Sequence, residues 1–353
     1  MIDRAEAVID MGALRANLRM LRARVSPAEL MFVVKDDAYC HGLERIVDTA
    51  AADGITWFGA LDAETALRVR RRSPEARVFA WLTDPDGDLG DAIGAGVEVG
   101  LSNVRQLRHA ASAASTQTAR VHLKIDTGLH RAGATPEDWP TLVREALRLQ
   151  CEGRVEIAGA WTHLAEASFD ADSLAISRFE AAVAAGEELG ATFPVRHLAA
   201  SAAAFERADS RFDLVRVGAF AYGIAPGDGV TPGSLGLVPV MTLRSVVREV
   251  KGDRAIVGIG YGDGLFRSMA GRVTVSVGSR RRVISKIDVD ELVLTGCPDV
   301  AVGDVVTLFG DGTHGEATLQ EWADALGTIG EEIAVRVSPR VPRRYLGAME
   351  TAD

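Results

Sequence analysis

Residues 31–52 read MFVVKDDAYCHGLERIVDTAAA and contain the pattern that decides the fold. A short apolar run, Met31–Lys35, ends at a lysine, and a longer run of helical composition, Gly42–Ala52, follows it. Runs of these two kinds alternate along the chain up to Pro226. The alternation predicts parallel strands joined by helices, because a connection between parallel strands must cross over the sheet.

Eight such runs predict strands: Met31–Lys35, Thr56–Leu61, Arg77–Leu82, Val97–Leu101, Arg120–Ile125, Glu156–Trp161, Val195–Ala199 and Asp213–Arg216. The stretches with helical composition are Ala13–Arg24, Gly42–Ala52, Ala63–Arg72, Val104–Ala114, Trp139–Leu149 and Ala171–Leu189. Eight parallel strands that alternate with helices are sufficient to close a (β/α)8 barrel of the TIM type, and we predict this fold. Continuous apolar runs are typical of strands whose outer face is covered by helices.

The residue pattern changes after Pro226, where glycine and proline cluster through Pro226–Gly236. Short valine-rich segments follow and predict a β-rich domain with hairpin-like turns. These segments are Met241–Val250, Ala255–Ile259, Arg272–Val277, Glu291–Thr295, Val305–Phe309 and a last run, Ile333–Ser338, with one helix, Leu319–Leu326, before the last. We therefore predict an N-terminal strand in 1–11 that packs with the C-terminal domain, a barrel over 12–232 and a β domain over 233–353.

Length and charge exclude several classes of protein. The chain has 353 residues and a formal charge of −10, which is enough chain for a large core and argues against nucleic-acid binding. No apolar stretch is long enough to span a membrane, and the acidic N-terminus lacks the pattern of a secretion signal, so we expect a cytoplasmic protein. Three widely spaced cysteines favour neither a disulfide framework nor a metal site.

In a β/α barrel, reactive groups lie at the carboxyl ends of the strands. The predicted strand ends carry Lys35, Asp126, Arg131, His163, His197, Ser201 and Arg216. Lys35 is one of only four lysines, and a buried lysine at a strand end can form an imine with a carbonyl compound. Taken alone, Lys35 is better explained as a surface lysine whose stem packs on apolar groups.

Seven segments together resemble the motifs of the alanine racemase family, in the order of that family. They are VVKDDAYCHG, KIDTGLHRAG, WTHLAEAS, HLAASAAA, LVRVGAFAYG, GIGYGDGLFR and SPRVPRRY, and they run from residue 33 to 345. The resemblance implies a barrel that binds pyridoxal 5′-phosphate, a C-terminal β domain and racemisation of an amino acid, most often alanine. It also implies a homodimer whose active sites are shared between two chains.

The resemblance assigns the two bases that racemisation requires. Lys35 matches the lysine that holds the cofactor and serves as the base on one face of the α-carbon, and Tyr261 matches the second base. Because a phenol has a pKa near 10, Tyr261 needs cationic neighbours, and His163 and Arg216 at matching positions would supply them. Alternatively, Tyr261 only packs its ring in a glycine-rich turn.

The cofactor contacts follow from the same resemblance. Arg216 matches the arginine that faces the pyridine nitrogen, and the phosphate contacts match Tyr39, Ser201, Gly218 and Ala219. Two structural alternatives stay open at this point. Arg216 could pair with Asp213, and Ser201 could cap a helix.

The resemblance also assigns the substrate contacts. Arg131 matches the residue that binds the substrate carboxylate, and Lys124 matches a lysine that is often carbamylated and holds that arginine. Alternatively, Lys124 is an ion-pair partner of Asp126. We expect His197 to be structural.

Two departures from the family lie near the expected substrate entrance. Val289 stands in place of a methionine whose backbone contacts the substrate carboxylate, and Glu331 stands in place of a tyrosine that contacts the phosphate. A carboxylate beside a phosphate is repelled unless it is protonated or paired, whereas it would attract a basic substrate. The alternatives are therefore a racemase of another polar or basic amino acid, or a protein that binds the cofactor without turnover.

Overall fold

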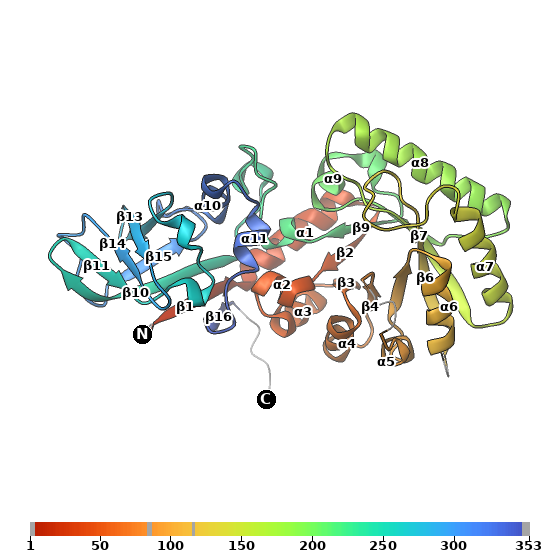
Figure 1. The fold of residues 1–353 in the computed structure, drawn as a ribbon, viewed down its shortest axis with the longest axis horizontal. Coiled ribbons are helices and arrows are strands. Elements are labelled where there is room, and N and C mark those ends of the chain that lie inside the picture. Colours follow the sequence, from red (N-terminus) through yellow and green to blue (C-terminus); the bar gives the residue numbers. More distant parts are fainter. Residues whose placement is uncertain (1–3, 83–86, 115–116, 348–353) are drawn as a thin grey trace. The chain divides into compact units, whose positions relative to one another are not determined.

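The computed structural model describes residues 4–82, 87–114 and 117–347, which form two compact units. The unit called here the barrel unit comprises Met20–Lys35 and Ala50–Gly218. The other, called the β unit, comprises the described residues up to Arg19, Asp36–Thr49 and those from Ala219 onward. Each unit holds one eight-stranded sheet (Figure 1).

The sheet of the barrel unit is parallel throughout, in the order β8-β7-β6-β5-β4-β3-β2-β9. Two backbone bonds join its end strands, from Asp213 N to Arg196 O at 3.2 Å and from Arg216 N to Ala199 O at 3.0 Å. The sheet is therefore closed, and the predicted barrel is confirmed. Its strands are β2 (Glu29–Val33), β3 (Trp57–Leu61), β4 (Arg77–Ala80), β5 (Glu98–Leu101), β6 (Ala119–Lys124), β7 (Val155–Trp161), β8 (Val195–His197) and β9 (Leu214–Val217).

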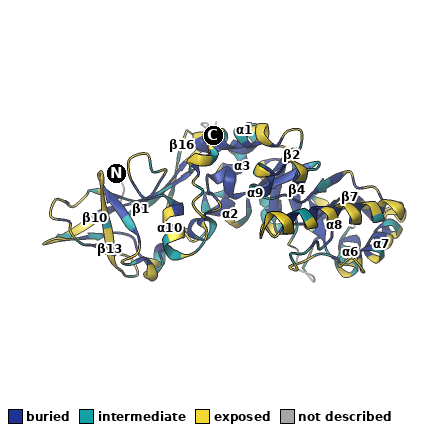
Figure 2. Ribbon diagram, turned by 90° about the horizontal axis from the view of Figure 1, so that it is seen from above, coloured by how far each residue is buried: buried dark blue, intermediate teal, exposed yellow. Residues whose placement is uncertain are grey.

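Apolar side chains from six of these strands form one buried cluster: Met31, Trp57, Phe79, Trp161, Val195 and Leu214. Figure 2 shows these strands buried and one face of α8 exposed, as expected for an amphipathic cover. The regular helices between residues 11 and 206 are α1 (Met11–Val25), α3 (Leu43–Ala52), α4 (Ala63–Arg72), α5 (Gly90–Gly94), α6 (Val104–Ala113), α7 (Trp139–Cys151), α8 (Phe169–Glu188) and α9 (Ser201–Glu206). Most residues of α1 and α3 belong to the β unit.

The sheet of the β unit has the order β11-β14-β13-β12-β15-β10-β1-β16. β1 pairs with β10 in antiparallel register, from Ala5 opposite Ser245 to Ile9 opposite Met241, and with β16 in parallel. The strands are β1 (Ala5–Asp10), β10 (Met241–Lys251), β11 (Arg254–Val257), β12 (Thr274–Val277), β13 (Arg280–Ile287), β14 (Leu292–Leu294), β15 (Val305–Phe309) and β16 (Arg343–Leu346), with helices α10 (Leu319–Leu326) and α11 (Gly330–Ala334).

Three elements of the β unit differ from the sequence prediction. The predicted run Ile333–Ser338 is not a strand, because α11 covers its start and Ile333 and Val337 are buried at helical spacing. β13 and β16 were not predicted. β13 lacks apolar alternation at its start, because Arg280 and Arg282 pair with Asp299 while Arg281 pairs with Glu321.

The segment after β2, labelled α2 (Lys35–Cys40), is a left-handed turn. Asp36 through Cys40 all have φ between 53° and 60°. For residues other than glycine this conformation costs roughly 1–2 kcal/mol each. Strain of this size persists only where the surrounding structure holds it, and it concentrates at functional sites.

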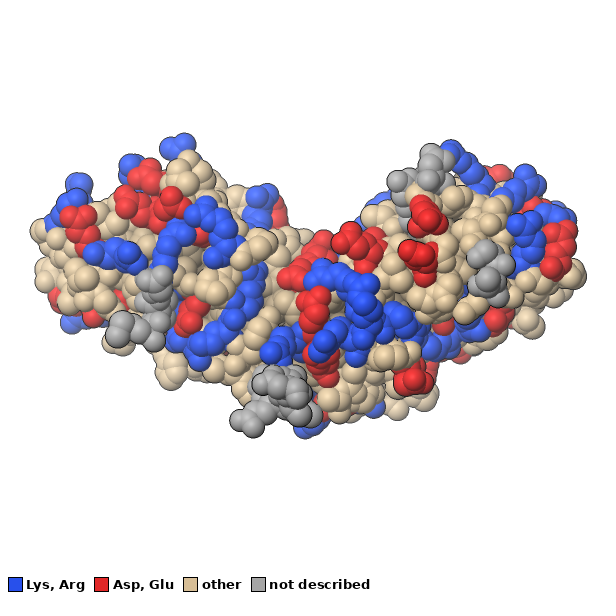
Figure 3. Space-filling model, turned by 90° about the horizontal axis from the view of Figure 1, so that it is seen from below, with Lys and Arg blue, Asp and Glu red and all other residues tan. Residues whose placement is uncertain are grey.

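Charged side chains of opposite sign are interspersed on the face drawn in Figure 3. Among the described residues, no helix combines the length and the apolar character needed to cross a membrane. The same residues contain no group of three or more His, Cys, Asp or Glu side chains placed to hold a metal ion. The predicted domain bounds remain a prediction, and they include residues 1–3 and 348–353, which lie outside the described part of the chain.

Candidate active site

Seven predicted site residues belong to the barrel unit and lie at or beyond the carboxyl ends of its strands. They are Lys35 after β2, Lys124 and Arg131 at and after β6, His163 after β7, Ser201 at the start of α9, and Arg216 and Gly218 at and after β9. β2 and β9 are paired, with Met31 opposite Arg216. This pairing places the strand that leads into Lys35 next to the strand that carries Arg216.

Arg216 is a buried cation, with 6% of its surface exposed. Its Nη1 donates to His197 Nδ1 at 2.9 Å. Its Nη2 donates to the Thr162 and Leu198 carbonyls at 2.9 and 3.0 Å and lies 3.2 Å from His163 Nδ1. Burial lowers the pKa of Arg216 to about 9, which leaves the guanidinium protonated at pH 7.

Asp213 does not pair with Arg216, which removes the ion-pair alternative considered from the sequence. The Asp213 carboxylate accepts from Arg196 Nε at 2.8 Å instead. The observed pairing leaves Arg216 inside the barrel.

The cations of this site perturb their neighbours. Burial, together with the charges of Arg216, Arg131, Lys124 and Lys35, lowers the pKa of His163 to about 3. His163 is therefore a neutral hydrogen-bonding group and not the cation expected from the sequence. Burial and the charges of Arg216 and Arg131 lower the pKa of Lys124 to about 8.

Lys124 does not form the ion pair with Asp126 that was considered as an alternative. Its Nζ lies 4.6 Å from the centroid of the Trp161 ring. Among the described residues no ion pair joins it to Asp126, whose carboxylate accepts from the Gly128 and His130 amides. Asp126 thus caps the turn after β6, and Lys124 lies buried among cations.

Ser201 and Gly218 are brought together, although they are 17 residues apart. The Gly218 amide donates to Ser201 Oγ at 3.1 Å. Ser201 is the first residue of α9, and Ala200 is its N-cap, so the capping alternative is wrong. A hydroxyl and a backbone amide next to each other are suitable donors for an anion.

The other predicted site residues belong to the β unit: Tyr39, Ala219, Tyr261, Val289 and Glu331. Tyr39 is buried, and its ring centroid lies 4.8 Å from that of Tyr222. Burial raises the pKa of Tyr39, and the negative charges of Glu331 and Asp36 raise it further. Glu331 therefore acts electrostatically on a residue expected to bind phosphate.

Tyr261 and Val289 lie side by side through their backbones. The Tyr261 amide donates to the Asp288 carbonyl at 2.9 Å, and the Gly262 amide donates to the Val289 carbonyl at 2.8 Å. A Cβ atom on Gly260 would lie 2.3 Å from the Asp288 carbonyl oxygen, so only glycine permits this approach. Both side chains are exposed, each by 44%.

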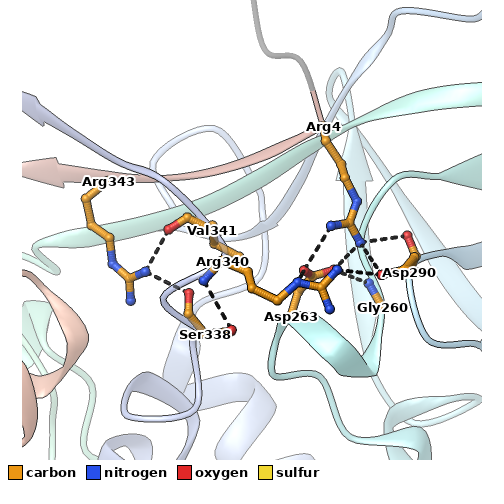
Figure 4. A network of polar contacts seen from close by, with 8 residues as sticks. All are labelled: Arg4, Gly260, Asp263, Asp290, Ser338, Arg340, Val341 and Arg343. Carbon is orange, nitrogen blue, oxygen red and sulfur yellow. Dashed lines mark hydrogen bonds and ion pairs between the residues drawn. The ribbon is translucent and has the colours of Figure 1, made fainter.

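A buried carboxylate that was not predicted holds this turn. Asp263 is 1% exposed, and Figure 4 shows Arg4 and Arg340 directed toward Asp263 and Asp290. Arg4 donates to both Asp263 oxygens, at 3.2 and 2.6 Å, and Asp263 Oδ2 accepts from the Gly260 amide at 2.9 Å. Arg4 is 259 residues from Asp263, so no local pattern in the sequence indicates the pair.

Comparisons with known proteins cover nearly the whole chain. Residues 9–226 match the family model for the alanine racemase N-terminal domain, and residues 244–345 match that for the C-terminal domain. The alanine racemase of Thermobifida fusca is 39% identical over 98% of this chain and 99% of its own length. That of Frankia casuarinae is 40% identical over 97% and 96%.

Solved structures agree with this match. The alanine racemase of D-cycloserine-producing Streptomyces lavendulae superposes with a TM-score of 0.94 at 37% identity, over 98% of both chains. That of Streptomyces coelicolor A3(2) gives 0.93 at 38% identity, again over 98% of both. The fold and motifs thus define a barrel isomerase of the amino-acid racemase class, as the sequence predicted. The chain belongs to the alanine racemase family.

We predict that replacing the buried carboxylate weakens the β unit more than replacing its exposed neighbour. Asp263→Asn removes the charge between two arginines but keeps an oxygen for Gly260. It should lower the free energy of unfolding by about 1–3 kcal/mol, since Arg4 is partly exposed and can be rehydrated. Asp290→Asn, whose side chain is 60% exposed, should cost much less, because solvent screens exposed ion pairs. Urea denaturation measures both, and equal losses would contradict the assignment.

Four buried or half-buried histidines predict the pH dependence of stability. Burial lowers the pKa of His41 to about 4 and that of His163 to about 3, and it lowers those of His122 and His197. The unfolded chain takes up protons below about pH 6.5 while these folded groups stay neutral, so stability falls as the pH drops from 6.5 toward 4. His41 should cost about 1 kcal/mol between pH 7.0 and 5.5 and the half-buried His163 less, while His122 and His197 change the stability in the same direction.

Urea denaturation at the two pH values measures this loss. His197→Asn should reduce the difference between them, whereas replacement of the exposed His314 by glutamine should leave it unchanged. A wild-type unfolding free energy that is the same at pH 7.0 and pH 5.5 would rule the interpretation out.

Proposed function

We propose that this chain is a pyridoxal 5′-phosphate-dependent racemase that interconverts L- and D-alanine. The observation that carries the proposal is the pairing of β2 with β9. It places Lys35 two residues beyond the end of β2, and the Arg216 cation lies buried on β9. The full-length similarity to alanine racemases supports the reaction and the substrate.

The residues of the barrel unit fit the cofactor. The Lys35 amine suits its aldehyde, the buried Arg216 guanidinium suits the pyridine nitrogen, and Ser201 and Gly218 offer a hydroxyl and an amide to the phosphate. We assign Tyr39 and the Ala219 amide to the phosphate on the family resemblance, and His163 to the support of Arg216. When bound, pyridoxal phosphate withdraws electrons from the substrate and makes its α-hydrogen acidic.

Racemisation needs proton removal on one face of the α-carbon and delivery on the other. We assign these two roles to the Lys35 amine and the Tyr261 hydroxyl, following the resemblance. Arg216 donates hydrogen bonds but keeps its own protons, because its pKa of about 9 lies above neutrality. It therefore leaves the pyridine nitrogen unprotonated and limits how strongly the ring delocalises negative charge, which disfavours transamination.

The substrate carboxylate would bind the Arg131 guanidinium and the Val289 backbone amide. A guanidinium fork matches a carboxylate in shape and charge. We further propose that Lys124 is carbamylated and orients Arg131. A pKa of about 8 leaves a substantial neutral fraction of the Lys124 amine near pH 8, and only the neutral amine reacts with carbon dioxide.

A second candidate substrate class rests on Glu331. Its negative charge raises the pKa of Tyr39, so a carboxylate acts where the family has an uncharged phenol. A carboxylate that faces the substrate attracts the side chain of a polar or basic amino acid. The homodimer with shared active sites and the cytoplasmic location belong to the same proposal.

We predict that the purified protein exchanges the α-hydrogen of L-alanine with solvent deuterium and yields both enantiomers. NMR follows the exchange, and chiral chromatography follows the products, over a panel of alanine, serine, lysine and arginine. Lys35→Ala should abolish both exchange and the absorption band of the bound cofactor. Tyr261→Phe should slow racemisation by about 10²–10⁴-fold, which is the usual weight of a general acid or base.

The matched control is Lys251→Ala, which removes an exposed lysine paired with Glu249 and should change neither activity nor spectrum. Exchange that persists in Lys35→Ala would contradict the assignment of the base. Exchange restricted to lysine or arginine would replace alanine by the basic class and implicate Glu331. A bound cofactor without exchange on any amino acid would contradict the racemase function.

The carbamate on Lys124 is tested separately. With ¹³C-bicarbonate at pH 8, the full-length protein should give a carbamate carbon resonance that Lys124→Ala lacks. Lys286→Ala, which changes an exposed lysine paired with Asp288, should keep the resonance. Lowering the pH to 6 should weaken it, because the amine becomes protonated. A spectrum identical in wild type and Lys124→Ala would exclude the modification.

A further inference from the structure

Three buried titratable residues inside the barrel have no role in the function proposed above. They are Glu98 on β5, His122 on β6 and His197 on β8, with exposed fractions of 2%, 0% and 0%. Burying ionisable groups is costly unless each is hydrogen-bonded, so their arrangement needs an explanation. Together with Arg216 on β9 they form one continuous line of hydrogen bonds.

Donor and acceptor roles in this line are fixed from one end. Arg216 can only donate, so His197 Nδ1, 2.9 Å from Arg216 Nη1, must accept. A neutral His197 then carries its hydrogen on Nε2, which lies 3.0 Å from His122 Nδ1. His122 must in turn carry its hydrogen on Nε2, 2.8 Å from Glu98 Oε2. One tautomer of each imidazole satisfies every contact.

The charges at the two ends agree with this assignment. Burial alone would raise the pKa of Glu98, but hydrogen bonds from His122 and Arg77 lower it to about 2. Arg77 donates to both carboxylate oxygens, at 2.7 and 2.8 Å. Burial lowers the pKa of His122, and the charges of Arg77 and Arg120 also lower it, against the hydrogen bond and charge of Glu98, which raise it. Burial and the charge of Arg216 lower the pKa of His197. The line thus runs from an anion through two neutral rings to a cation.

Packing keeps the two rings from turning. The Trp161 ring lies parallel to His197, with centroids 5.8 Å apart and planes 6° apart. Phe79 packs against both imidazoles, with centroid distances of 4.9 Å to His122 and 5.3 Å to His197. A ring flip would put C–H groups in place of the ring nitrogens at these contacts, and the packed aromatic rings obstruct the rotation.

We propose that Glu98, His122 and His197 are positioning residues that fix the guanidinium of Arg216 in one orientation. Within this line of hydrogen bonds, His197 accepts from Arg216 Nη1. At the other end, Glu98 accepts from His122 and so fixes the direction in which each hydrogen bond is donated. None of the four contacts that Arg216 makes uses its Nε–H. The orientation held by the line determines where that group points. The functional consequence rests on the role proposed above for Arg216 at the pyridine nitrogen.

Two measurements test the proposal on the full-length holoenzyme. The first is ¹⁵N NMR of histidine-labelled protein, with His122→Asn and His197→Asn for assignment. Both residues should appear as neutral Nε2–H tautomers, unchanged between pH 6 and 9. An imidazolium or an Nδ1–H tautomer at either position would overturn the proposed line.

The second measurement compares two substitutions of His197. His197→Asn keeps an oxygen to accept from Arg216, whereas His197→Leu removes the acceptor. His197→Leu should lower the racemisation rate constant by roughly 10- to 100-fold, the weight of one hydrogen bond to a charged group. It should also raise the ratio of oxo acid formed by transamination to amino acid racemised. His197→Asn should restore most of both values, and Glu98→Gln should cause a smaller shift in the same direction.

His109→Leu is the matched control, since His109 lies on α6 outside the line and bonds to the Gly87 carbonyl. It should leave the ratio unchanged. Thermal unfolding confirms that each variant is folded. An unchanged ratio in folded His197→Leu would overturn the positioning role. Absence of exchange in the wild type with cofactor bound would instead contradict the proposed function, while the tautomers would still decide the hydrogen-bond line.

Discussion

The interior of the barrel is organised around a permanent cation that cannot accept a hydrogen bond. Arg216 is buried, so each polar group around it must present a lone pair. The Thr162 and Leu198 carbonyls do so as parts of the backbone, and His197 and His163 do so through Nδ1. This one requirement sets the tautomer of His197, then that of His122, and ends at the Glu98 carboxylate. The neutrality of His163 follows from the same field.

A second constraint acts on the segment after Lys35. Five consecutive residues in the left-handed region are strained, and several contacts within the β unit hold them. Asp37 Oδ1 accepts from the Leu43 amide at 3.1 Å, and His41 Nδ1 lies 3.0 and 2.9 Å from the Ala38 and Tyr39 carbonyls. Arg343 Nε donates to the Cys40 carbonyl at 3.0 Å, so a residue of β16 at the far end of the sequence supports the turn. The turn buries Tyr39 four residues after Lys35.

Periodicity and motifs were sufficient for the barrel, because its strands are short, mainly apolar runs that alternate with helical stretches. They failed at β13, where arginines on both faces pair with Asp299 and Glu321 and hide the alternation. They also failed for contacts between distant residues. In the sequence, Asp263 is only a polar residue in a glycine-rich turn, and nothing indicates its pairing with Arg4. The position of His122 on β6, two residues before Lys124, likewise does not indicate its hydrogen bond to Glu98. The motif resemblance located candidate residues but carried no information on tautomers or charge states.

The electrostatics of the barrel unit point to anionic ligands, in contrast to the net charge of −10 for the whole chain. Arg216, Arg131 and Lys124 act together on His163, and the first two lower the pKa of Lys124. Glu98 is already paired with Arg77 and His122, so its negative charge does not neutralise the other cations of the barrel. Such a concentration of positive charge is stabilised by negative groups that enter the site. A phosphate, a substrate carboxylate and a carbamate on Lys124 are all of this kind, and each would raise the pKa of the cations it contacts. The charge of the site therefore favours the ligands that the proposed reaction requires.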